Sequence, residues 1–235
     1  IAKNCKQLKA LLNVTSDKCY QNNEWFWGYR ESDRLGGHDP YSNSKACAEL
    51  VTSSFRLSFF EQLNIGLATA RAGNVIGGGD WSQDRLIPNF IRAQQNSTGL
   101  SIRNPKAIRP WQHVIEPVFG YLRLCEKLYH EPKKYSDAWN FGPNDFDMVD
   151  VETVINEMQS HVSESVNVTF NKDESMHEAS LLKLDVSKAK NQLKWESRWD
   201  FKETIKHTAD WYENYFQQQD IYEYSLSQVM KYLSN

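Results

Sequence analysis

Two short apolar segments, each followed at once by polar residues, constrain the fold of this chain more than any other feature. They are "ALLNVTS" at residues 10–16 and "IGLATARAGNV" at residues 65–75. Continuous apolar runs of this kind are typical of strands that are buried on both faces of a parallel sheet. Residues 41–63, between the two segments, are predicted to form a helix, with Pro40 where the chain enters it. The order strand, helix, strand predicts α/β architecture with parallel strands.

The rest of the chain continues this alternation of strands and helices. We expect residues 3–10 to end a surface helix, and residues 21–40, which are polar, aromatic and Gly-rich, to form a long loop. Apolar residues spaced three and four apart predict an amphipathic helix at residues 115–130. The remaining predicted elements are helices at 86–95, 151–162 and 203–216, a short helix after Asp185, and strands at 100–104, 138–142 and 166–170.

Length, charge and cysteine content exclude several classes of protein. A length of 235 residues allows one large domain or one and a half ordinary ones. The net charge of -3 gives no bulk attraction to nucleic acid or to an anionic membrane. The sequence has no apolar run of about 18 residues, so no transmembrane helix is predicted. The four cysteines form no CxxC motif, which favours reduced thiols in a cytoplasmic protein. No metal is expected, because no spacing such as HExxH is present.

Polar clusters stand at the ends of both predicted strands, Thr15–Lys18 after the first and Gly73–Asp80 after the second. In parallel sheets, ligands bind outside the carboxyl ends of the strands, so both clusters are predicted to lie at a ligand-binding edge. The second cluster lacks both G-x-G-x-x-G and GKS or GKT, and we expect it to form a flexible loop that shapes a substrate site. Trp25, Trp27 and Trp81 lie in predicted loops near this edge, where they either cover a ligand or pack in the core.

Tyr41 and Lys45 share one face of the predicted helix, because they are four residues apart. A lysine ammonium close to a phenol stabilises the phenolate, which makes the tyrosine a usable base for an alcohol or sugar hydroxyl. The pair alone is weak evidence, since a surface tyrosine stacked on a lysine stem has the same pattern. It becomes specific when a strand that ends in Ser or Thr lies about 25 residues upstream, as Ser16 does.

This combination resembles the extended short-chain dehydrogenase/reductase family, whose Ser or Thr, Tyr and Lys act together beside a bound nicotinamide. "VTSDK" supplies Ser16, and "YSNSK" supplies Tyr41 and Lys45. The segments "RAGNVIGGGD", "RLIP", "IRPWQHV" and "WNFG" follow in the family's order, so the resemblance covers essentially the whole chain. It implies that NAD is the cofactor and that Ser16, Tyr41 and Lys45 contact it.

Within that family, the sequence resembles the nucleotide-sugar 4,6-dehydratase branch, in which an Asp and usually a Glu follow the Ser or Thr. Here Asp17 and Lys18 occupy these positions, so a lysine stands where the Glu is usual. The Ser-Asp-Lys version, together with "CYQNNEWFWGYRE", "DPYSNSKACAELV" and "IRPWQHV", is similar to the members of the branch that act on CDP-glucose. The resemblance implies a lyase that converts CDP-glucose to CDP-4-keto-6-deoxyglucose in deoxysugar biosynthesis of the O-antigen type.

The resemblance also implies roles in catalysis. First, Tyr41 takes the proton of the glucose 4-hydroxyl while hydride passes from C4 to NAD. A base then removes the acidified hydrogen on C5, an acid protonates the 6-hydroxyl, and water leaves. Finally, the hydride returns to C6. We assign the acid role to Asp17 and the base role to Lys18, because positive charge on Lys45 and the nicotinamide disfavours a second ammonium. Two alternatives remain: Lys18 stabilises the enolate as a cation, or Asp17 and Lys18 form a solvated ion pair.

The diphosphate of such a substrate needs cations and amide donors. Asn74 in "AGNV" matches the family's asparagine that reaches the diphosphate, and Arg109 in "IRPW" matches its phosphate-binding arginine. The alternative readings are a turn residue for Asn74 and a surface charge for Arg109.

Four further residues are candidates for binding the nucleotide. Arg85 and Leu86 in "DRLIP" lie where the family contacts it, and Arg103 in "SIRN" falls where a related branch stacks a tyrosine on the base. An arginine also stacks on a pyrimidine, so Arg103 is a candidate for cytosine preference. His177 in "MHEASLLKLD" matches a family histidine near the nucleotide end. For Arg85, Arg103 and His177, an ordinary exposed side chain is an equal alternative.

No phosphate-cradling Gly fingerprint for a dinucleotide occurs in the sequence, and its elements begin about where the family's fifth strand runs. We therefore expect a fragment that lacks the N-terminal half of the Rossmann domain and is inactive alone. Residues 1–75 are predicted to be the remainder of the NAD-binding domain. Residues 76–235 are predicted to form mainly a nucleotide-sugar-binding domain, from which residues 110–145 return to the Rossmann domain.

Two other functions remain open at this point. Another nucleotide-sugar epimerase or decarboxylase of the same superfamily would keep Ser16, Tyr41 and Lys45 but would not need Asp17 and Lys18. A non-catalytic sensor that binds a nucleotide usually loses the tyrosine or the lysine, and fold alone does not separate these possibilities. Helices like residues 41–63 commonly pair in this family, so a homodimer or homotetramer is expected.

Overall fold

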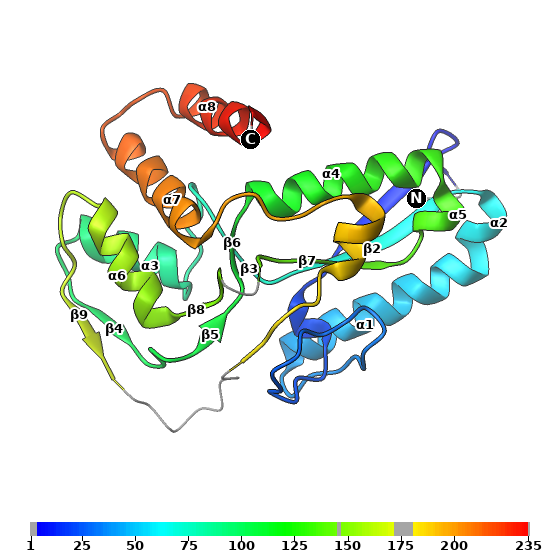
Figure 1. The fold of residues 1–235 in the computed structure, drawn as a ribbon, viewed down its shortest axis with the longest axis horizontal. Coiled ribbons are helices and arrows are strands. Elements are labelled where there is room, and N and C mark those ends of the chain that lie inside the picture. Colours follow the sequence, from blue (N-terminus) through cyan, green and yellow to red (C-terminus); the bar gives the residue numbers. More distant parts are fainter. Residues whose placement is uncertain (1–3, 145–146, 172–180, 235) are drawn as a thin grey trace. The chain divides into compact units, whose positions relative to one another are not determined.

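The strands predicted at residues 10–16, 65–75 and 138–142 are confirmed as neighbours in one parallel sheet. In the computed structural model, which describes residues 4–144, 147–171 and 181–234, their order is β1-β2-β7 (Figure 1). The strands are β1 (Ala10–Val14), β2 (Gly66–Ala72) and β7 (Ala138–Phe141). Every residue of the central strand β2 is buried, as expected for a strand covered on both faces.

The chain divides into two units, of which the first contains this sheet. The first unit consists of residues 1–73, 117–142 and 182–196, and the second of residues 74–116, 143–181 and 197–235. The helical segments associated with the first unit are the 3₁₀ turn η1 (Asp17–Cys19), α1 (Pro40–Phe55), the π-helical turn η2 (Arg56–Phe60), α2 (Glu61–Leu63), most of α4 (Ile115–His130), α5 (Pro132–Tyr135) and the π-helical turn η4 (Ala189–Leu193).

Helices cover both faces of the sheet, and the alternation of side chains along β2 decides which residue meets which helix. Thr69 points toward α1, where its hydroxyl donates to Glu49. Gly66 faces α4, and a Cβ added there would lie 2.9 Å from the carbonyl oxygen of Leu128. Figure 1 shows α1 and α4 on opposite sides of β2 and β7. The glycine thus allows α4 to approach the sheet closely.

The predicted helix at residues 41–63 is confirmed as α1, η2 and α2 in continuous succession. It begins where the Asp39 side chain accepts a hydrogen bond from the Ser42 N–H, and Pro40 occupies the first helical position. It ends at Asn64, whose φ of 52° is left-handed.

Three details of the prediction are wrong. Among residues 4–9 the structure has turns instead of a helix, because the Lys9 carbonyl accepts from Gly66 N–H as the sheet begins. The apolar run at 65–75 breaks at Gly73, and β3 (Asn74–Ile76) pairs instead with β6 (Trp111–His113) in the second unit. The predicted last helix is followed by another, α8 (Ile221–Ser234).

The second unit has its own apolar core and short paired strands. Its core includes Phe90, Ile155 and Ile205, all 1% exposed or less. Its elements are β3, β6, α8, α3 (Leu86–Gln95), β4 (Leu100–Ile102), β5 (Ile108–Arg109), β8 (Val149–Asp150), α6 (Val151–His161), β9 (Val168–Phe170) and α7 (Phe201–Phe216). Strands β4 and β9 pair parallel, and strands β5 and β8 pair antiparallel.

The Gly-rich loop after β3 is packed against α7, which corrects the expectation of a flexible loop. A Cβ on Gly78 would lie 2.0 Å from ring atoms of Trp211, so only glycine fits there. The Tyr212 hydroxyl donates to the Asp80 carbonyl at 2.8 Å. The glycines therefore serve close packing of the loop on the helix.

No helix among residues 4–144, 147–171 and 181–234 is both long and apolar enough to span a membrane.

Two histidines are buried together in the second unit. The Trp199 ring stacks on His207 at 4.1 Å between centroids and meets the His113 ring at 4.8 Å. Burial, with His207 nearby, lowers the pKa of His113 to about 3. Burial, with Lys231 nearby, lowers the pKa of His207 to about 4. Both imidazoles are therefore neutral in the folded protein at neutral pH.

We predict that this pair makes the second unit lose stability in mild acid. An unfolded histidine titrates near pH 6.5, so below that pH the unfolded chain binds protons that the folded one cannot take up until pH 3–4. The free energy of unfolding then falls by up to about 1.4 kcal/mol per pH unit for each histidine. Urea unfolding of the full-length protein at pH 7.5, 6 and 5 measures this slope. The loss of unfolding free energy per pH unit should be smaller for His207→Gln than for the wild type. Equal losses in the two proteins would contradict the prediction that buried His207 causes the acid sensitivity.

Candidate active site

The turn that follows β1 carries the first group of predicted site residues. The Ser16 hydroxyl accepts from Lys18 N–H at 3.2 Å and donates to Asp17 Oδ1 at 3.1 Å. This arrangement caps the 3₁₀ turn η1 and holds the three residues together at the carboxyl end of the strand. Asp17 is only 2% exposed, so a solvated ion pair is the wrong description of this carboxyl group. Lys18 is half-buried.

Tyr41 and Lys45 lie in the first turns of α1, as predicted. Tyr41 is 53% exposed, and the Lys45 ammonium lies 5.6 Å from the centroid of its ring. Hydrogen bonds from the Ser42 side chain and N–H lower the pKa of the capping Asp39 carboxylate below its ordinary value. The cap and Pro40 fix where the helix starts and hence where the tyrosine stands.

Two hydrogen bonds bring these two groups of residues to the same edge of the sheet. Asn13 Nδ2 donates to Thr52 Oγ1 at 2.8 Å, and the Thr15 hydroxyl donates to Glu49. Residues nearer the carboxyl end of β1 thus bond to residues nearer the start of α1, where Lys45 and Tyr41 lie. α1 also packs directly against η1.

A buried polar network that the sequence patterns did not predict lies beneath this edge. Arg71 Nη2 lies 2.7 Å from Glu49 Oε2, and both side chains are 3% exposed. Arg71 Nη1 also donates to the Tyr20 hydroxyl at 2.7 Å, which donates in turn to Asn140 Oδ1 at 2.7 Å. Burial by itself would lower the pKa of Arg71, but the hydrogen bond to Glu49 raises it above its ordinary value. An arginine inside the apolar run "GLATARA" was the available signal, because a buried charge needs a partner.

Cys19 also lies beside this network. Burial raises the pKa of its thiol to about 12, although Arg71 acts in the opposite direction. The thiolate is the reactive form of cysteine, so this residue is inert.

In the second unit, two predicted diphosphate-binding residues stand on strands. Asn74 is the half-buried first residue of β3. Arg109 ends β5, is 7% exposed, and donates from Nη1 to the Ile108 carbonyl at 3.0 Å. Its burial contradicts the alternative of an ordinary surface charge.

The other predicted nucleotide-binding residues differ in exposure. The Arg85 side chain is 62% exposed and lies 3.8 Å from the Asp80 carboxylate, whereas Leu86 packs against the core of the second unit. Arg103 is exposed. His177 lies outside the described residues.

The three loop tryptophans take different positions. Trp25 packs against Tyr29 with ring centroids 5.0 Å apart, and Trp27 is 71% exposed. Trp81 contacts the rings of Tyr212 and Tyr215 at 5.3 and 5.4 Å, so it packs against α7.

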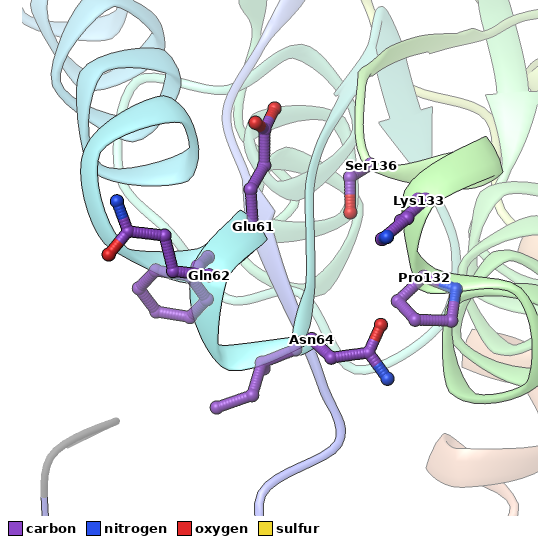
Figure 2. A pocket seen from close by; sticks show the side chains of 8 residues that line it. Glu61, Gln62, Asn64, Pro132, Lys133 and Ser136 are labelled. Atoms are coloured by element: carbon purple, nitrogen blue, oxygen red, sulfur yellow. The ribbon is translucent and has the colours of Figure 1, made fainter.

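A hollow of about 470 Å³ lies at the opposite edge of the first unit's sheet. Ile65 and Ser136, which line it, precede β2 and β7, so it faces the amino ends of these strands. Figure 2 shows Glu61, Asn64 and Lys133 around it. Ligands of parallel sheets bind at the carboxyl ends, so this hollow is separate from the candidate site. No group of three or more His, Cys, Asp or Glu residues is arranged to hold a metal in the described part of the chain.

Comparison with known proteins identifies the family. The model of a family described as GDP-mannose 4,6 dehydratase matches residues 1–208. The chain belongs to this family. The expected resemblance to nucleotide-sugar 4,6-dehydratases of the extended short-chain dehydrogenase/reductase type is thus confirmed. A CDP-glucose 4,6-dehydratase of Salmonella typhimurium is 48% identical over 97% of this chain, which spans 65% of that protein's length.

Solved structures support the fold. The dTDP-glucose 4,6-dehydratase of Bacillus anthracis, in complex with NAD, has a TM-score of 0.70 at 19% identity, covering 89% of this chain and 63% of that one. The UDP-glucose 4-epimerase of Brucella ovis, also in complex with NAD, has a TM-score of 0.75 at 16% identity, covering 87% and 65%. The predicted α/β fold of Rossmann type is therefore confirmed.

We predict that Asp39→Ala lowers the free energy of unfolding by about 1 kcal/mol, because the first turn of α1 loses its cap. Asp39→Asn should stay close to the wild type, since an asparagine oxygen caps as well. Urea unfolding of the full-length protein compares the two variants. Equal destabilisation by Ala and Asn would mean that the charge, rather than the cap, matters here.

Proposed function

We propose that this chain is part of an NAD-dependent CDP-glucose 4,6-dehydratase, a hydro-lyase that forms CDP-4-keto-6-deoxyglucose. One observation carries the proposal: a Ser-Asp-Lys turn and a Tyr-Lys pair lie at the same carboxyl edge of a parallel sheet. The 48% identity to the Salmonella protein supports CDP-glucose as the substrate.

Ser16, Tyr41 and Lys45 fit a nicotinamide site. Tyr41 is exposed, and the Lys45 ammonium lies beside its ring. Tyr41 then accepts the proton of the sugar 4-hydroxyl. The Ser16 hydroxyl, which donates to Asp17 Oδ1 in this structure, turns to donate to the same sugar oxygen when the substrate binds. When bound, NAD would supply the hydride acceptor for C4 and the hydride donor for C6.

Asp17 and Lys18 carry the dehydration. Once C4 is a ketone, the hydrogen on C5 is acidic; Lys18 removes it as a base or, as an ammonium, stabilises the resulting enolate. Asp17 donates a proton to the 6-hydroxyl, which leaves as water. The burial of Asp17 shields this proton from bulk solvent.

We assign the nucleotide to the second unit. Asn74 and Arg109 bind the diphosphate, with a buried guanidinium as the fixed cation. The other proposed contacts to the nucleotide are Arg85, Leu86, Arg103 and His177. The first unit is then the remainder of the NAD-binding domain.

The setting of this activity is part of the proposal. The chain spans 65% of its Salmonella relative, and we expect turnover only from the full-length protein. We propose a cytoplasmic homodimer or homotetramer that supplies deoxysugars of the O-antigen type.

In the test, the full-length protein and NAD are incubated in separate samples with CDP-, dTDP-, UDP- and GDP-sugars. Mass spectrometry then detects whether the sugar has lost water. We predict turnover of CDP-glucose only, and a loss of at least about 100-fold in Tyr41→Phe, because the general base is removed. Turnover of another nucleotide sugar alone would overturn the CDP assignment.

Asp17→Asn separates dehydration from oxidation. This variant should still reduce NAD, which absorbance at 340 nm reports, but should release water at least about 100-fold more slowly. If the wild type reduces NAD and never releases water, the epimerase alternative is favoured instead.

A further inference from the structure

Glu49 joins α1 to β2 and to the residue that follows β1 through one carboxylate. Its Oε1 accepts from the Thr15 hydroxyl, and its Oε2 accepts from Thr69 Oγ1 and from Arg71 Nη2, both at 2.7 Å. Thr15 directly precedes Ser16, and Thr69 and Arg71 lie on β2. A single side chain of the helix is therefore fixed to both β2 and the end of β1.

The position of Glu49 on the helix connects it to the proposed base. It follows Lys45 by four residues and Tyr41 by eight, so all three lie along one side of α1. Any shift of Glu49 along the helix axis moves Tyr41 and Lys45 by the same amount relative to Ser16.

Arg71 fixes the β2 side of this contact between helix and sheet. Besides Glu49, it donates to the Tyr20 hydroxyl at 2.7 Å and to the Glu31 carbonyl at 3.1 Å. The Asn140 side chain accepts from Tyr20 and donates to the Tyr29 carbonyl at 2.8 Å. The network thereby reaches from α1 across β2 to β7 and the loop after η1.

We propose that Glu49 is a positioning residue, whose carboxylate sets the distance between the Tyr41–Lys45 pair and Ser16. The inference rests on the proposed function, because it concerns the same active site. Buried ion pairs often add little net stability over apolar side chains of similar volume. Because the Arg71–Glu49 pair fixes the position of Tyr41 and Lys45, it affects turnover separately from its effect on the stability of the fold.

The test compares variants of the full-length protein with NAD and CDP-glucose. Glu49→Gln keeps the shape of the side chain but leaves Arg71 without its anion. The double variant Glu49→Gln/Arg71→Met removes the stranded charge while the carboxylate is still missing. Leu124→Val and Leu124→Ala, at a fully buried position of α4 outside the network, serve as controls matched in thermal midpoint.

We expect Glu49→Gln to lower kcat about 10- to 100-fold with KM within about threefold, because a shift of about 1 Å at a reacting group has effects of this size. The double variant should regain most of the lost thermal midpoint yet keep the low kcat. Recovery of wild-type kcat in the double variant would overturn the proposal. An equal loss of kcat in the matched Leu124 variant would do the same.

NAD reduction at 340 nm distinguishes this proposal from the proposed function. If the wild type reduces NAD with another nucleotide sugar and releases no water, the dehydratase assignment fails. The same variants are then compared by the rate of NAD reduction with that sugar, where the predicted pattern is unchanged.

Discussion

The ion pair between Arg71 and Glu49 is the interaction on which the first unit depends. Both charges are removed from water, so each requires the other, and each also uses its remaining hydrogen-bonding groups on neighbouring elements. Arg71 lies on the central strand and Glu49 on the helix that carries Tyr41 and Lys45. Because the Arg71 guanidinium and the Glu49 carboxylate must stay in contact, their pairing also determines where α1 lies on the sheet.

The proposed chemistry follows from how parallel strands end. β1 ends in a Ser-capped turn, which places Ser16, Asp17 and Lys18 together at the carboxyl edge of the sheet. A proline and an aspartate cap start α1 beside the same edge, so Tyr41 is exposed while Glu49, two turns later, is buried. One helix thus presents a reactive group to the ligand side and a fixed group to the sheet.

Local patterns sufficed to predict the three strands of the main sheet, the helix that carries Tyr41 and Lys45, and the position of Ser16 at the end of a strand, because each signal lies within one element and its ends. The Arg71–Glu49 pair joins residues 22 apart on a strand and a helix, and no local pattern specifies that match. Helix α8 was missed because its anchoring is tertiary: Tyr232 donates to Glu116, 116 residues away. The need for Gly78 depends likewise on Trp211.

The most direct test of the central claim, that these residues perform oxidation and dehydration on one sugar ring, follows a single hydrogen. The full-length protein would receive NAD and CDP-glucose that carries deuterium at C4 of the glucose. We predict that the 4-keto-6-deoxy product carries this deuterium at C6 and a solvent-derived hydrogen at C5. Deuterium that remains at C4, or that exchanges into solvent without loss of water, would contradict the claim.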